Sequence, residues 1–91
     1  MPIISHFYGI LIYIYSIYSE KNEKHHTPHF HAKYAGEMGV YTFDGGRLEG
    51  ALPRKQEKMV EVWCSLHEDE LNAAWAAWNE SGETIKIEGL R

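Results

Sequence analysis

The histidines of this chain are concentrated in one short stretch. Four of the six histidines fall within residues 25–31, a density that is uncommon by chance. They are His25, His26, His29 and His31. If the segment after Pro28 is a β-strand, the side chains of His29 and His31 point to the same face, with Cα atoms about 6.5 Å apart. Two imidazoles at this spacing can share one metal ion, or serve as an acid and a base near neutral pH.

A metal site would need a third ligand beside His29 and His31. A borderline ion such as zinc or nickel accepts imidazole or carboxylate ligands, and three protein ligands plus water make a catalytic type of site. The sequence offers four candidates for the third ligand, which are His25, His26, His67 and Glu49. Without metal, the pair His29 and His31 would be the catalytic residues of a small hydrolase or nuclease, with phosphodiester cleavage as the reaction to test.

A structural interpretation of the same histidines stands beside the chemical ones. In it, they cover one face of a sheet, form hydrogen bonds with the backbone and hold the preceding loop against the strand. Neither a His-Glu-x-x-His motif nor a Cys-x-x-Cys pair supports a metal site elsewhere in the sequence. The lone Cys64 lies in a helical pattern with no activating base nearby, so we expect it to be buried and unreactive.

The N-terminal half predicts the strands that would position the histidines. Residues 3–18 are rich in Ile, Tyr and Phe, which predicts one long strand whose two faces both need to be covered. The polar run 19–27 predicts an exposed loop, and residues 29–34 alternate as a second strand. Asp44-Gly45-Gly46 is typical of a hairpin turn, here joining strands over 40–43 and 47–52.

The C-terminal half predicts two helices. After Pro53, two sets of apolar residues recur at helical spacing, and each set forms a stripe along one side of a helix. On one straight helix the second stripe would be rotated about the axis by roughly 80° from the first, so two separate helices are expected. The two stripes are Met59, Val60, Trp63 and Leu66, then Leu71, Ala74, Trp75 and Trp78. Ser65 and Glu68 have the spacing of a capping box, so we expect a break near His67. Ser81-Gly82 ends the second helix, Ile85 and Ile87 suggest a short last strand, and the tryptophans are expected in the core.

Composition narrows the fold and the partners. The 91 residues predict a single domain over 1–91, with an α+β fold in which a curved antiparallel sheet of three to five strands packs against two C-terminal helices. The net charge of −4 disfavours nucleic acid as a partner. The only candidate for a membrane span is the apolar stretch 7–15, which is shorter than the ~20 residues of a spanning helix and lacks the features of a signal peptide. We therefore expect a cytoplasmic protein without membrane contact.

The order of short motifs along nearly the whole chain resembles one bacterial family, called domain of unknown function 4160. The motifs are Met1-Pro2, Ile4-Ser5, Phe7, Gly9-Ile10, Pro28-His29-Phe30-His31-Ala32, Tyr34, Asp44-Gly45, Leu48-Glu49-Gly50, Leu52-Pro53, Trp63, His67, Glu70-Leu71 and Trp75. In that family the histidine block usually reads Asp-His-x-Pro-Pro-His-Phe-His. The resemblance therefore implies His25, His29 and His31 as the histidines of the candidate metal site, while Lys24 replaces the acid and Thr27 replaces a proline.

The resemblance implies no established activity, and two functions remain open. Family members are typically small bacterial proteins encoded beside another short protein, in arrangements that look like toxin-antitoxin pairs. The leading hypothesis is therefore a protein-interaction module that binds a small protein encoded nearby, or a second copy of itself as a homodimer, through a sheet face or edge. The alternative is a hydrolase or nuclease that uses the histidine cluster, with a divalent metal such as zinc or without one.

Overall fold

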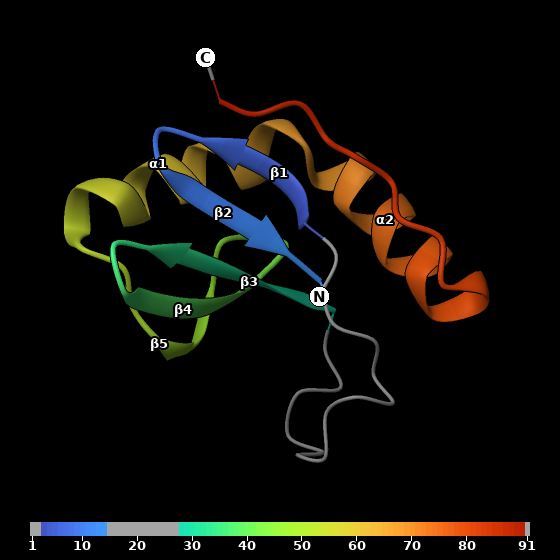
Figure 1. Cartoon of the computed structure of the whole chain (residues 1–91), viewed down its shortest axis with the longest axis horizontal. Coiled ribbons are helices and arrows are strands. Elements are labelled where there is room, and N and C mark those ends of the chain that lie inside the picture. The colour runs from blue at the N-terminus through green and yellow to red at the C-terminus, as the bar shows by residue number, and fades with distance from the viewer. Residues whose placement is uncertain (1–2, 15–27, 91) are drawn as a thin grey trace.

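The computed structural model describes residues 3–14 and 28–90 and has an α+β fold (Figure 1). A five-stranded antiparallel sheet comes first, and each strand pairs with the next in the order β1-β2-β3-β4-β5. Two helices follow. The elements are β1 (Ile3–Phe7), β2 (Ile10–Tyr13), β3 (His29–Tyr34), β4 (Glu37–Thr42), β5 (Arg47–Gly50), α1 (Arg54–Leu66) and α2 (Glu68–Ser81). The predicted fold class is confirmed, while the loop predicted over 19–27 lies outside the described residues.

The prediction of one long first strand is wrong, because the chain reverses within it. Tyr8 and Gly9 form a two-residue turn between β1 and β2, with φ of 48° and 80°. Positive φ at both central residues is the turn geometry that matches the twist of paired strands, and glycine adopts it without steric penalty. Ala35 and Gly36 repeat it between β3 and β4, with φ of 47° and 87°. Apolar residues continue on both sides of Tyr8-Gly9, so Gly9 was the only sign of a turn in this part of the sequence.

The helices pack on one face of the sheet, which we call the first face. In Figure 1, α1 lies behind the strands and α2 extends past their end, and neither helix crosses in front of them. Phe30 is central to the core on the first face, with its ring centroid 5.6 Å from that of Trp63 in α1 and 5.8 Å from that of Tyr41. The other fully buried members of this core include Ile10, Ile12, Val60, Cys64 and Leu71. The expected core role is confirmed for Trp63, which is fully buried, while Trp75 and Trp78 are only partly buried against the core.

The hydroxyl of Tyr41 connects the sheet to the start of the helical layer. It donates a hydrogen bond to Glu57 Oε2 at 2.8 Å and accepts one from the buried backbone N–H of Leu52 at 3.1 Å. The Tyr41 ring lies over Gly39, where an added Cβ would stand 2.6 Å from the tyrosine hydroxyl. Burial and the neighbouring Glu57 raise the pKa of Tyr41 to about 12, although the Leu52 hydrogen bond opposes the shift. The hydroxyl therefore stays protonated and keeps both bonds.

The turn before β5 forms as predicted. The carboxylate of Asp44 accepts hydrogen bonds from the Thr42 hydroxyl and, at 3.1 Å, from the backbone N–H of Gly46. These two bonds lower the pKa of Asp44. The backbone closes the turn through Thr42 N–H to Gly46 O at 2.7 Å. The predicted hairpin of β4 and β5 is thereby confirmed.

The helices end where predicted, but the hydrogen bonds at these ends are not all the predicted ones. The chain breaks at His67 as expected, yet the capping box is wrong, because Ser65 Oγ donates to the carbonyl of Val62 within α1. Gly82 ends α2 in the left-handed conformation, with φ of 71°. The last strand is also wrong: residues 83–90 form no strand, and Ile87 makes a single backbone bond of 2.7 Å to the Ile4 carbonyl.

We predict that Tyr41→Phe lowers the free energy of unfolding by about 1–3 kcal/mol, because it leaves the buried Leu52 N–H without its acceptor. Urea unfolding followed by circular dichroism measures the difference. Tyr8→Phe is the matched control, since the exposed Tyr8 should change stability by less than about 0.5 kcal/mol. Equal stability of Tyr41→Phe and the control would contradict the role of this hydroxyl.

We predict that Cys64 does not react with a disulfide reagent at pH 8 while the protein is folded. Burial, with smaller contributions from acidic groups such as Asp44 and Glu61, raises the pKa of its thiol to about 12 and removes the reactive thiolate. In concentrated guanidinium the same thiol should react fully. Rapid reaction of the native protein would show that this side of α1 opens readily to solvent.

Candidate functional site

His29 and His31 lie next to each other on the same side of β3. Their ring centroids are 5.5 Å apart with an interplanar angle of 64°. The alternation of a strand accounts for this, because Phe30 between them points to the first face and packs in the core. The histidines therefore belong to the opposite face, which we call the second face.

Both histidines are enclosed by packing. His29 is 1% exposed and His31 is 8% exposed. The His31 ring stacks on that of Tyr13 from β2, with centroids 5.7 Å apart and planes only 6° apart. The His29 ring lies 5.2 Å from that of Trp75 in α2. These contacts join the sheet to α2 and leave little of either imidazole accessible to a substrate.

The third metal ligand is not found among the described residues. No three His, Cys, Asp or Glu side chains in residues 3–14 and 28–90 are grouped so as to hold one ion. Glu49 is exposed on β5, two strands from His31 and thus about 10 Å away across the sheet. His67 lies at the helix junction, where its Nδ1 is 2.6 Å from Glu70 Oε1. His25 and His26 lie outside the described residues, so the site His25, His29 and His31 stays a prediction.

Part of the second face is accessible and apolar, and we call this part the Lys33 patch. It consists of the exposed Ile3, Lys33 and Met38, together with the half-buried Leu11 and the buried Tyr13. Four of these residues, all except Met38, line a hollow of about 160 Å³. Ile3 is 40% exposed and Met38 is 42% exposed. The Tyr13 hydroxyl points to the Met38 sulfur at 3.9 Å, which places Met38 at the margin of the hollow.

The Lys33 patch follows from the sheet register. Leu11 pairs with Lys33 and Lys33 with Met38 on neighbouring strands, so an exposed ammonium group stands between two apolar side chains. The sequence suggested that residues 3–18 have a second apolar face needing cover, but it did not single out Lys33. Lys33 stands out only once the strand pairing places it beside Leu11 and Met38, and the sequence does not give this pairing.

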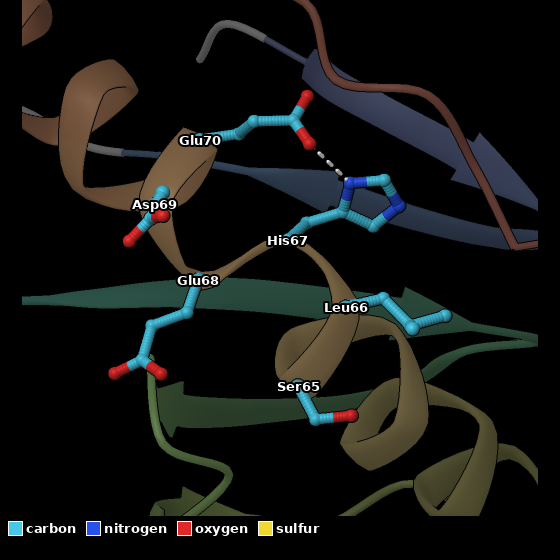
Figure 2. A pocket seen from close by; sticks show the side chains of 6 residues that line it. All are labelled: Ser65, Leu66, His67, Glu68, Asp69 and Glu70. Carbon is cyan, nitrogen blue, oxygen red and sulfur yellow. Dashed lines mark hydrogen bonds and ion pairs between the residues drawn. The ribbon is translucent and has the colours of Figure 1, made fainter.

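A second, polar hollow lies where α1 meets α2. It is lined by residues 65–70 and has a volume of about 440 Å³. Figure 2 shows the His67 ring turned toward the carboxylate of Glu70, with the carboxylates of Glu68 and Asp69 around the same junction. Three successive acidic residues in the first turn of α2 stabilise the helix through its dipole. The sequence had singled out Ser65 and Glu68 here only as a cap.

Neither α1 nor α2 is long and apolar enough to cross a membrane, and the described part of the chain contains no other helix.

Comparison with known proteins identifies a family for this chain but no similar curated protein or solved structure. A search of the curated proteins found no match, and a search of the solved structures found none. One family model matches residues 9–76, a span that includes β2 to β5, all of α1 and most of α2. The match contains His29, His31 and the Tyr41 network. The chain therefore belongs to the DUF4160 family, a domain of unknown function.

Proposed function

We propose that this chain is a protein-interaction module that binds a small partner protein at the Lys33 patch. The observation that carries the proposal is the exposed apolar surface around Lys33, Ile3 and Met38, on the part of the second face away from the contact of His29 with α2. Exposed apolar side chains with polar groups at their margin are typical of protein-binding surfaces.

The size of the hollow favours a protein over a small molecule. At about 160 Å³ it is smaller than the roughly 300–1,000 Å³ of small-molecule sites. It has room for a side chain, and Ile3 and Met38 extend the contact area on either side. The occupant we propose is a partner segment that inserts an apolar side chain beside a carboxylate, because Lys33 can then form an ion pair at the margin of a desolvated contact.

The histidines support this role as packing groups. His31 stacks on Tyr13, and Tyr13 lines the hollow, so His31 fixes one of its surfaces. His29 continues the contact to Trp75 in α2. In this proposal His29 and His31 hold the binding surface in shape. The partner would be the short protein encoded beside family members, which makes the pair a toxin-antitoxin-like system.

We predict that Lys33→Glu/Met38→Glu weakens binding to the product of the adjacent gene by at least about tenfold, or 1.4 kcal/mol. The substitution places charge against the partner's apolar side chain and repels its carboxylate. Isothermal titration calorimetry measures the dissociation constants.

Two controls accompany this prediction. Ala73→Glu adds a charge at an exposed position of α2 and should leave binding unchanged, and Lys33→Arg should retain it. Equal affinity of the double variant and Ala73→Glu would refute the Lys33 patch as the binding surface. A monomer by light scattering in a mixture of the two proteins would refute the adjacent-gene partner.

A metal-dependent hydrolase or nuclease is the second candidate function, favoured by one observation. The two imidazoles of His29 and His31 lie with their centroids 5.5 Å apart on one face, so a small rotation of the rings would let both bind one ion. A divalent ion such as zinc, held by them and by His25, would activate a water for attack on a phosphodiester.

This candidate predicts near-stoichiometric metal in purified, untagged protein and loss of that metal in His29→Ala/His31→Ala. Inductively coupled plasma mass spectrometry measures it, with His6→Ala as the control for an exposed histidine. Metal-free wild-type protein that also fails to bind added zinc would exclude the metal-dependent function and leave the partner-binding function unaffected.

A further inference from the structure

One row of side chains crosses four strands on the second face, and we call it the His6 row. Leu11 pairs with His6 on one side and with Lys33 on the other, and Lys33 pairs in turn with Met38. Residues directly opposite each other in an antiparallel pair have their side chains on the same face of the sheet. His6 and Lys33 are exposed, Met38 is 42% exposed and Leu11 is half-buried. The His6 row therefore alternates hydrogen-bond donors with accessible apolar side chains.

The surroundings of the His6 row are poor in acidic side chains, although the whole chain has a net charge of −4. Strands β1, β2 and β3 contain no Asp or Glu. On β4, Glu37 pairs with Tyr34, which packs toward the first face, and on β5 Glu49 belongs to the neighbouring row. Lys86 adds a cation at the edge of β1, where its Nζ donates a hydrogen bond to the Ile3 carbonyl at 2.5 Å. Carboxylates of a partner are therefore attracted to this surface of an otherwise acidic chain.

The spacing of the His6 row matches the turns of an α-helix laid across the strands. Neighbouring strands are about 4.8 Å apart, and an α-helix advances about 5.4 Å per turn. His6 and Lys33 are two strand spacings apart, or about 10 Å, which is close to the rise of seven helical residues. An extended segment would fit less well, because its side chains on one side recur about every 6.7 Å and lose register with the strands.

We infer that the partner segment recognised at the Lys33 patch is an acidic amphipathic helix that lies across the strands along the His6 row. The inference rests on the proposed partner-binding function and specifies its partner. The helix carries carboxylates at i and i+7 and apolar side chains at i+3 and i+10. At about 100° per residue these four positions lie within about 80° of one another, so they share one side of the helix.

Each of the four positions meets one residue of the His6 row. The carboxylate at i accepts a hydrogen bond from the His6 imidazole, which has an N–H donor in either protonation state. The carboxylate at i+7 forms an ion pair with Lys33. The apolar side chains at i+3 and i+10 contact Leu11 and Met38, and the hollow of about 160 Å³ that Leu11 lines has room for the first of them.

Isothermal titration calorimetry of the full chain with synthetic peptides tests the inference. The probe is an alanine-rich helical peptide with glutamate at i and i+7 and leucine at i+3 and i+10. The control peptide has the same composition, with the glutamates moved to i+2 and i+9 on the opposite side of the helix. We expect the chain to bind the probe at least about tenfold more tightly than the control peptide. In 0.5 M NaCl this preference should decrease, because salt screens an exposed ion pair.

A charge exchange protects the test against misfolding. His6→Glu/Lys33→Glu should lose binding of the acidic probe and should gain binding of a peptide with lysine at i and i+7 in place of the glutamates. A variant that failed to fold could not gain this binding. Ala73→Glu, at an exposed position of α2, should retain the preference of the wild type for the acidic probe.

The outcomes separate this inference from the partner-binding function. Equal binding of the probe and the control peptide would overturn the inference, as would a charge-exchanged variant that does not bind the lysine peptide. If Lys33→Glu/Met38→Glu weakens binding to the product of the adjacent gene but His6→Glu does not, the helix along the His6 row is wrong while the Lys33 patch still binds the partner. Tighter binding to phosphatidylserine vesicles than to the probe would assign the row to a membrane surface and would also overturn the inference.

Discussion

The Tyr41 hydroxyl is the interaction on which the arrangement of layers depends. It bonds at once to Leu52, in the segment that leaves β5, and to Glu57 in the first turn of α1. Glu57 also lies 3.6 Å from Arg47 on β5, so one buried tyrosine orients the entry of the chain into the helix. The absence of a side chain at Gly39 makes space for the ring. Because α1 is held to the first face in this way, the part of the second face around Lys33 remains for other contacts.

Local chemistry predicted the elements wherever a turn or cap carries its own signal. Asp44-Gly45-Gly46 and Gly82 specify their geometry through side chains and backbone freedom, and both were found as predicted. The turn at Tyr8-Gly9 was missed because apolar residues continue on both sides of it. The turn forms because β1 pairs with β2, and not because of a strong local preference of its residues. The predicted capping box does not form, because the Ser65 hydroxyl donates its hydrogen bond to the Val62 carbonyl within α1. Local bonds of this kind between a serine side chain and the backbone compete with helix capping.

The candidate site was predictable in its periodicity but not in its surroundings. A strand period of two was enough to place His29 and His31 on one side of β3. Their enclosure depends on Tyr13, which lies 18 residues before His31, and on Trp75 from the second helix. Lys33 became notable only when the register set it between Leu11 and Met38. Contacts of this kind come from the topology, which the spacing of residues does not encode.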